Sequence, residues 1–195
     1  VGIAKLGQKI VDAYYSLPNK AKGKGVNVSI SVSTFVPKPF TPFQFEPQIG
    51  LEEIRRRQEL LKNAIKTKKI TLSYHDSSTS FLEGAFARGD RRMGAVIETA
   101  YKMGCTFDSW TECFDPEKWY KAFETCGLTP EFYANRTREY GEISPWEHID
   151  VGVTKDFLIK ENQTAHENKT TPNCREKCSN CGAMCYGEGV CFEKR

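Results

Sequence analysis

The stretch from Val26 to Gln44 constrains the fold more than any other part of the chain. Apolar and small polar residues alternate strictly from Val26 to Val32, which is the period of a β-strand with one face against a packed layer. Pro37, Pro39 and Pro42 then stop the strand, because each fixes φ and lacks a backbone donor. The sequence predicts either a stiff loop at the ligand-binding end of a strand or a surface loop without chemistry.

The segments on either side of this strand predict an α/β fold with parallel strands. Helical periodicity is already under way at Ile3 with no capping residue before it, so we expect the sequence to begin inside a helix. A second amphipathic helix starts near Leu51 and carries Arg55–Arg57 on its polar face. The run Lys69–Tyr74 is a second predicted strand, and alternation of helix and strand at this spacing is typical of parallel sheets.

Beyond residue 76 the chain is predicted to be mainly helical. Ser80–Glu83 matches a capping box, and Asp90 is placed to cap a helix that Gly104 ends. Three further short helices are expected where a capping residue precedes a proline, at Asp115-Pro116, Thr129-Pro130 and Ser144-Pro145.

These patterns divide the chain into three expected regions. Residues 1–76 form the α/β part, residues 77–167 form a helical extension, and residues 168–195 form a linker and a Cys-rich tail. The helical extension is expected to end with an extended piece over 148–153 and a helix over 154–167.

The helical extension is also rich in aromatic residues. We expect these side chains to form a small core, with a base-stacking surface as the alternative. They are Phe107, Trp110, Phe114, Trp119, Phe123, Phe132, Tyr133 and Trp146.

The composition limits where such a protein works and what it binds. No run approaches the roughly 18 to 20 apolar residues of a membrane helix, and no signal peptide is recognisable, so a cytoplasmic location is expected. A net charge of +3 is too small to indicate nucleic acid, but seven basic and three acidic residues gather between Leu51 and Lys69. This segment is either a solvated helix face or a basic groove for a polyanion.

Five of the eight cysteines lie in the last 22 residues, the fifth being Cys191. Loops of three, two and three residues separate the first four of them, which lets several thiolates converge on one centre. An iron–sulfur cluster and zinc both accept four cysteines, and a redox-active or unliganded tail is the third possibility. The expected metal ligands are Cys174, Cys178, Cys181 and Cys185.

Four segments together resemble the carboxyl-terminal part of a family of radical S-adenosylmethionine (SAM) proteins that carry a cobalamin-binding domain. They are Phe35–Gln44, Ser80–Arg92, Phe107–Trp110 and the Cys-rich run. The resemblance covers nearly the whole chain, and it implies the last helix–strand units of a partial (β/α) barrel followed by a helical extension and a Cys-rich tail. The catalytic cysteines and the Gly-rich SAM motif of the family are absent from the sequence, so this chain alone is not expected to cleave SAM.

The resemblance also implies cofactors for a full-length parent: SAM, a catalytic [4Fe–4S] cluster and, if it takes part in turnover, cobalamin. The substrate is not identified. The Cys-x3-Cys-x2-Cys spacing of the tail matches that of the catalytic motif, but the tail follows the barrel and Cys185 offers a fourth ligand. We therefore expect a separate, closed metal centre there.

The alternative to the radical SAM interpretation is that the chain is a self-contained metal-stabilised binding module, for RNA, that uses the basic helix and the tail.

Several polar residues are candidate site residues within this resemblance. Those expected near SAM or the substrate, at the end of the late barrel strand, are Ser33, Thr34, Lys38 and Thr41. A second group is either a helix junction with a capping aspartate and solvated arginines or an anion-binding corner, and it comprises Arg88, Asp90, Arg91 and Arg92. His75 and Asp76 form either a turn or a proton-transfer pair.

Overall fold

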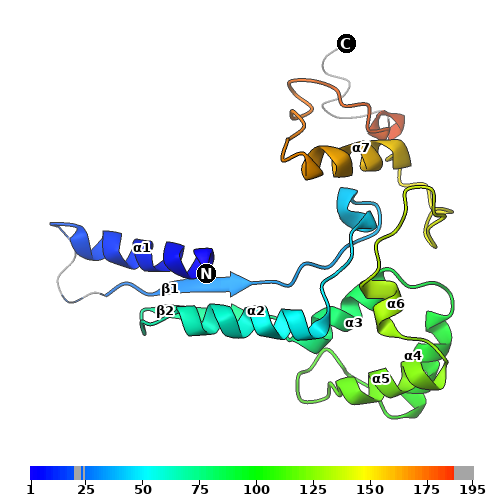
Figure 1. The fold of residues 1–195 in the computed structure, drawn as a ribbon, viewed down its shortest axis with the longest axis horizontal. Helices are drawn as coiled ribbons and strands as arrows, with labels where there is room; N and C mark the ends of the chain where they lie inside the picture. The colour runs from blue at the N-terminus through cyan, green and yellow to red at the C-terminus, as the bar shows by residue number, and fades with distance from the viewer. Residues whose placement is uncertain (20–22, 24, 187–195) are drawn as a thin grey trace. The chain divides into compact units, whose positions relative to one another are not determined.

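The computed structural model describes residues 1–19, 23 and 25–186, and the part it describes is mostly helical with one parallel pair of strands (Figure 1). The chain divides into two compact units. Unit 1 comprises Val1–Phe35 and Ile49–Phe81, and unit 2 comprises Val36–Gln48 and the residues from Leu82 onward. An α/β fold is therefore confirmed, whereas membership of a partial barrel stays a prediction.

Unit 1 contains the sheet. Strand β1 (Val28–Val32) pairs in parallel with β2 (Ile70–Tyr74), so both predicted strands and their relative direction are confirmed. Val28 lies opposite Ile70 in the register. The alternation of the sequence has the expected effect, because Val28, Ile30 and Val32 are partly buried whereas Ser29 and Ser31 are exposed.

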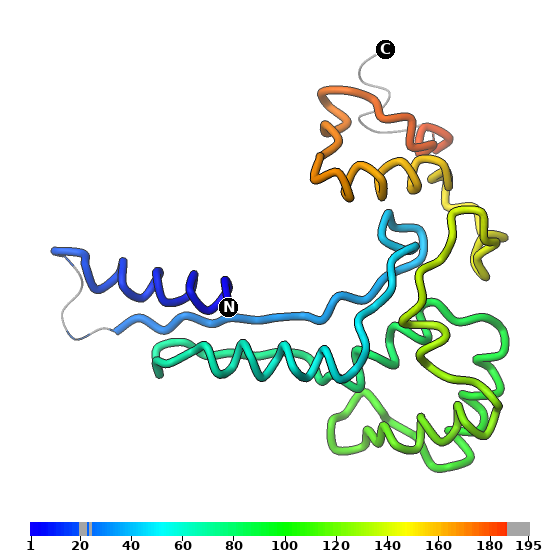
Figure 2. The backbone as a smooth tube through the Cα atoms, in the orientation of Figure 1, coloured from blue at the N-terminus to red at the C-terminus, as the bar shows by residue number. Residues whose placement is uncertain are grey.

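Two helices belong to unit 1. Helix α1 (Gly2–Ser16) runs alongside β1 (Figure 2) and buries Ala4, Gly7 and Val11. Gly7 allows the close approach, since a Cβ at this position would lie 2.9 Å from Cδ1 of Ile30. Helix α2 (Leu51–Ala64) buries Ile54 and Leu61. Several large apolar residues of α1 and its ends remain exposed: Val1, Ile3, Leu6, Ile10 and Leu17.

Unit 2 holds the remaining elements. They are the 3-10 helix η1 (Pro42–Phe45), most of α3 (Ser77–Ala87), α4 (Met93–Lys102), α5 (Pro116–Thr125), α6 (Pro130–Ala134), α7 (Lys155–His166) and the 3-10 helix η2 (Ala183–Tyr186). Its core includes Val96, Phe123 and Tyr133, each at most 1% exposed. The ring of Phe86 contacts those of Trp119 and Phe123, with centroids 5.3 and 5.9 Å away.

Most predicted helix ends are confirmed. Gly104 ends α4 with φ +89°, a conformation that glycine adopts without steric cost. The Asp115 side chain accepts a hydrogen bond from the Glu117 backbone at the start of α5, and Thr154 accepts one from Phe157 at the start of α7.

Two predicted helix starts are wrong. Helix α3 begins at Ser77 rather than at Ser80, because the Asp76 carboxylate accepts the backbone N–H of Thr79 at 2.8 Å and caps the helix earlier. The same contact shows that Asp76 belongs to a turn and a cap.

Ser144-Pro145 starts only a turn, and the structure has no strand over 148–153. Tertiary bonds of Trp146 and the residues after it, described below, hold this segment in an irregular path.

The aromatic core forms only in part. Phe123, Tyr133 and Trp146 are buried, as predicted, but Phe107 is 76% and Trp110 63% exposed. The prediction was too broad because aromatic content does not show which face of a short helix or loop meets the core.

Candidate functional site

The residues predicted to lie near SAM or the substrate are divided between the two units. Ser33 and Thr34 belong to unit 1, whereas Lys38 and Thr41 belong to unit 2. The Lys38 ammonium pairs with the Glu83 carboxylate, and the Thr41 hydroxyl donates to the Lys38 carbonyl at 2.8 Å. Lys38 and Thr41 thus shape the proline loop itself.

One buried side chain holds the end of the proline loop. Gln44 is 4% exposed, and its Oε1 accepts hydrogen bonds from the Phe40 backbone N–H at 2.9 Å and from Trp146 Nε1 at 3.0 Å. Phe40 has φ +58°, in the left-handed region that a bulky residue rarely adopts. The Gln44 amide therefore fixes a strained backbone and ties the proline loop to the turn that follows Pro145.

A half-open pocket of about 190 Å³ lies between these two segments and the start of α7. Phe40, Gln44 and Trp146 form part of its lining, and Val153, Lys155 and Leu158 contribute from the other side. Glu147 also lines it. The pocket is the hollow that the proline loop and the 146–153 turn create together.

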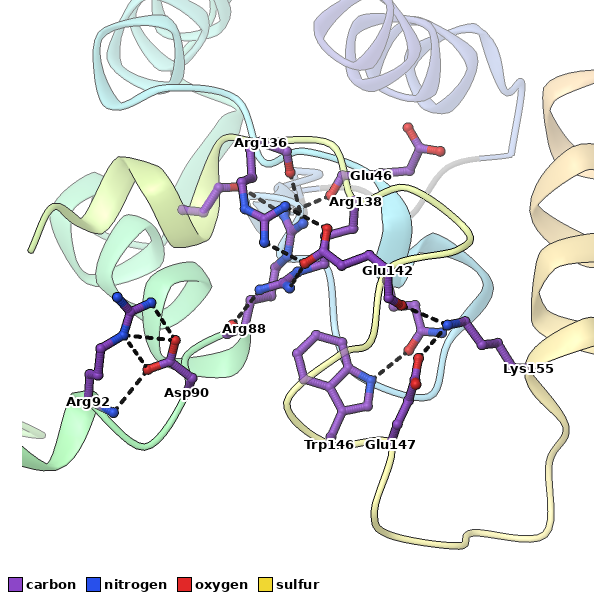
Figure 3. A network of polar contacts seen from close by, with 12 residues as sticks. Glu46, Arg88, Asp90, Arg92, Arg136, Arg138, Glu142, Trp146, Glu147 and Lys155 are labelled. Atoms are coloured by element: carbon purple, nitrogen blue, oxygen red, sulfur yellow. Dashed lines mark hydrogen bonds and ion pairs between the residues drawn. The ribbon is translucent and has the colours of Figure 1, made fainter.

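Lys155 makes the polar corner of this pocket (Figure 3). Its ammonium donates to the Glu142 carbonyl at 2.7 Å and pairs with the Glu147 carboxylate. The hydrogen bond from Lys155 lowers the pKa of Glu147, so this corner holds a charged, balanced pair at neutral pH.

Arg88 is a structural residue. It is 0% exposed, and its guanidinium donates to the carbonyls of Glu46 at 2.9 Å, Ala134 at 3.0 Å and Arg136 at 2.8 Å (Figure 3). Burial lowers the pKa of Arg88 to about 10, which still leaves it charged at neutral pH. Arg88 is neither a solvated arginine nor a residue open to an outside anion.

Two more arginines surround one carboxylate beside Arg88. Arg136 and Arg138 donate to Glu142 at 2.5 and 2.7 Å, and Arg138 also donates to the Arg88 carbonyl at 2.7 Å. The hydrogen bond from Arg136 lowers the pKa of Glu142. The Arg138 guanidinium lies 5.1 Å from the centre of the Trp146 ring, so the cluster supports one wall of the pocket.

The rest of the predicted group forms a surface helix junction. Asp90 accepts from the Arg92 backbone at 2.9 Å and from the Arg92 guanidinium at 2.7 Å, and these hydrogen bonds lower the pKa of Asp90. Arg91 and Arg92 are exposed. The structure therefore separates the four residues, with Arg88 in the core and the other three at the start of α4.

The predicted metal ligands lie mostly on the surface. Cys174, Cys178 and Cys185 are exposed and Cys181 is partly buried, whereas Cys191 falls outside the described residues. Within the described part of the chain, no group of three or more His, Cys, Asp and Glu side chains is arranged to hold a metal ion. The donor types suit iron–sulfur or zinc, but among the residues that the structure describes three or more of these thiols are not gathered at one place.

The tail nevertheless contacts the residues just before α7 and the start of that helix. The Cys181 carbonyl accepts the Thr154 backbone N–H at 2.9 Å. Gly182, at φ +101°, lies so close to the Gly152 carbonyl that a Cβ would be 2.5 Å from its oxygen. The turn after Cys181 therefore has a fixed place beside the start of α7.

A further polar network was not predicted. Glu46 accepts from Asn162 Nδ2 at 2.9 Å and lies 2.7 Å from His166 Nε2, while the Tyr140 hydroxyl donates to Asn162 Oδ1 at 2.6 Å. Burial raises the pKa of Glu46, but the bonds from Asn162 and His166 outweigh it and the net pKa is lowered. No sequence motif marks this network, because Glu46 is more than a hundred residues from Asn162 and His166 along the chain.

No protein-family model, no curated protein and no solved structure matches this chain. Among the helices that the structure describes, none is long and apolar enough to cross a membrane.

Proposed function

We propose that this chain is the carboxyl-terminal part of a radical SAM iron–sulfur enzyme of the cobalamin-binding-domain family. Unit 1 would supply the last helix–strand units of the barrel, and unit 2 with the tail would form the extension. The parent enzyme would cleave SAM reductively, act on a substrate still to be identified and work in the cytoplasm. Its catalytic cluster would be held by residues outside this sequence.

The observation that carries this proposal is the two-faced sheet of unit 1. Its apolar face is partly buried and includes Ile30, which contacts α1 at Gly7, whereas the opposite face is polar and exposed. In a (β/α) barrel, helices cover the outer face of parallel strands and the other face lines the interior. The exposed polar positions are Ser29, Ser31, Thr71 and Ser73.

The RNA-binding alternative has less support from unit 1. The arginines of α2 are already paired within the helix, Arg55 with Glu52 and both Arg56 and Arg57 with Glu53. With four basic and three acidic residues, α2 has a net charge of only +1, and its paired arginines attract a polyanion less strongly than unpaired arginines would.

An activity comparison tests the enzyme proposal. The polypeptide encoded by this chain together with its upstream reading frame should, when reduced anaerobically with SAM, release 5′-deoxyadenosine, whereas the 195-residue chain should release none. A start codon immediately before Val1, or nucleoside release by the chain alone, would overturn the proposal.

The proposal includes a metal centre in the tail, separate from the catalytic cluster. Cys174, Cys178, Cys181 and Cys185 would hold an iron–sulfur cluster, with zinc as the alternative, and four thiolates would leave no position for substrate. Its role would be structural or in electron transfer. This rests on the donor set and its spacing.

Metal and sulfide analysis after anaerobic purification tests the tail. We expect equal amounts of iron and sulfide in the wild type and a loss of both in Cys178→Ala. Cys113→Ala is the matched control, since Cys113 is also exposed but lies outside the tail. Zinc without sulfide would favour the zinc alternative. Equal metal content in Cys178→Ala and Cys113→Ala would rule out Cys178 as a ligand.

A further inference from the structure

We propose that unit 1 docks on an anionic membrane surface through the exposed face of α1, with the helix lying in the plane of the membrane and its aliphatic side chains among the lipids. The inference concerns unit 1 alone and does not depend on the radical SAM proposal or on the metal centre. It rests on the residues that α1 exposes, on their spacing and on the charge of unit 1.

Helix α1 buries its small residues and exposes its large ones. The residues that it buries are Ala4, Gly7 and Val11. Ile3, Leu6 and Ile10, in contrast, are 49%, 60% and 47% exposed. Large aliphatic side chains gain the most from leaving water, so packing within unit 1 would be expected to place them inward. Their outward position indicates that α1 has a second contact surface.

The exposed apolar residues of this helix form one continuous row, the α1 stripe. It comprises Ile3, Leu6, Ile10, Ala13 and Leu17, all of them exposed. They follow one another at alternating intervals of three and four residues, which places them on one side of a helix. Single exposed apolar residues are common on protein surfaces, whereas a contiguous row marks a binding surface.

The charge of the chain is concentrated on the unit that carries the α1 stripe. Unit 1 contains twelve Lys and Arg and five Asp and Glu, a net charge of +7. Unit 2 contains sixteen basic and twenty acidic residues, a net charge of −4. An anionic bilayer complements both properties of unit 1, since its lipid phosphates attract the basic residues and its acyl region takes up the aliphatic ones.

Exposed lysines lie near the α1 stripe. Lys5 and Lys9 are exposed on α1 itself. Lys69 lies near the end of the helix, with its Nζ 4.8 Å from the centre of the Tyr15 ring. A lysine stem can lie along apolar surface while its ammonium reaches the lipid headgroups. Three further lysines follow α1 in the sequence but lie outside the described residues: Lys20, Lys22 and Lys24.

Other partners would use only part of this surface. A second copy of the chain would cover the α1 stripe, but two units of charge +7 repel each other, so self-association is the weaker contact that remains when no membrane is present. RNA would use the charge, but proteins bind single strands by stacking bases on aromatic side chains, and the α1 stripe is entirely aliphatic. An anionic membrane uses the charge and the stripe together.

Flotation of the 195-residue chain with lipid vesicles tests the proposal. We expect the chain to float with vesicles of equal parts phosphatidylcholine and phosphatidylserine, to bind pure phosphatidylcholine at least about tenfold more weakly, and to lose affinity as salt is added. An Ile10→Trp variant reports insertion. Its added fluorescence should be quenched by lipids with brominated acyl chains, whereas the three native tryptophans, all in unit 2, should not be quenched.

Matched variants locate the surface. Leu6→Ser combined with Ile10→Ser should weaken binding to the anionic vesicles at least about tenfold, because it removes two aliphatic side chains from the stripe. Ile97→Ser combined with Ile143→Ser is the control and should bind as the wild type does, since these residues are 50% and 82% exposed but belong to unit 2. Lys5→Gln should weaken binding about fivefold, the effect of one charge near the surface.

Several outcomes would overturn the proposal. They are absence of flotation, equal binding to neutral and anionic vesicles, equal binding by the stripe variant and its control, and an Ile10→Trp signal that brominated lipids do not quench. Binding of polyuridylic acid by a chain that binds no vesicles would also overturn it and would assign the charge of unit 1 to RNA.

Discussion

The two units are stabilised in different ways. In unit 1 the strands pair through a regular register, and helix α1 leaves Leu6 60% exposed. In unit 2 a completely buried arginine, Arg88, joins three backbone carbonyls from segments more than forty residues away along the chain.

This difference shows where each unit is vulnerable. Unit 1 buries mainly apolar side chains such as Ile54 and Ile70, and large apolar residues of α1 are exposed, so substitutions at these exposed positions are expected to have modest effects. Unit 2 concentrates its long-range connections in a few buried polar groups, and removing one leaves partners without a hydrogen bond. The following predictions test that contrast, beginning with the largest expected effect.

Arg88→Met should destabilise unit 2 by about 3–5 kcal/mol, because it leaves three buried carbonyls without their charged donor. Urea unfolding followed by tryptophan fluorescence measures this, since all three tryptophans lie in unit 2. Arg91→Met is the matched control on an exposed arginine and should change stability by less than about 0.5 kcal/mol. Equal effects of the two variants on the free energy of unfolding would show that burial of Arg88 does not stabilise unit 2.

Gly84→Ala in unit 2 should cost about 1–3 kcal/mol, because the added methyl group would overlap Oε1 of the buried Gln48. Gly7→Ala in unit 1 should cost less than Gly84→Ala, since the close atoms are two side-chain tips, Cδ1 of Ile30 at 2.9 Å and Cδ1 of Ile70 at 3.3 Å, which can turn aside. A methyl group on Gly94 would have no other atom within 4 Å, so Gly94→Ala should stabilise α4 by about 0.5–1 kcal/mol. Unfolding followed by circular dichroism compares the three.

Acid should destabilise unit 2 through Glu142. Arg136 lowers the pKa of Glu142 in the folded protein, so its contribution is complete above the ordinary value of 4.5 and is lost as the pH falls through the lowered value. Below pH 4.5 the fluorescence-detected stability of Glu142→Gln should therefore fall less steeply than that of the wild type, by up to about 1.4 kcal/mol per pH unit.

Glu53→Gln is the control in unit 1 for this pH dependence. Hydrogen bonds from Arg56 and Arg57 lower the pKa of Glu53 to about 2, but these pairs are at the surface and screened by water and salt. The pH profile of stability detected by circular dichroism, which also reports the helices of unit 1, should be unchanged in this variant. A profile altered as strongly as in Glu142→Gln would show that surface pairs matter as much as the buried cluster.

The smallest effect on stability is expected at the exposed face of α1. Leu6→Glu should change the free energy of unfolding by less than about 0.5 kcal/mol, because Leu6 is 60% exposed. It should reduce self-association of the chain, measured by analytical ultracentrifugation, since exposed apolar surface promotes association. Lys9→Gln makes the same change in net charge on an exposed site and should not reduce association.

The sequence predicted the local parts of this protein well. Strict alternation over Val26–Val32 found β1, helical periodicity found α1 and α2, and capping residues helped to find α4, α5 and α7. It failed where two local signals competed. Asp76 and Ser80 are both good capping residues, and only the structure shows that Asp76 takes the Thr79 N–H and starts α3.

The sequence by itself determined the parallel α/β character of unit 1, the helical nature of unit 2 and the clustering of cysteines in the tail, because these follow from the spacing of neighbouring residues. Only the tertiary structure decided that Arg88 is buried, that Gln44 joins Phe40 to Trp146 and that Lys155 stands beside Glu147 at a pocket. The reason is physical: whether a polar side chain is solvated or buried depends on partners distant in the chain, and their positions are set only when the chain folds.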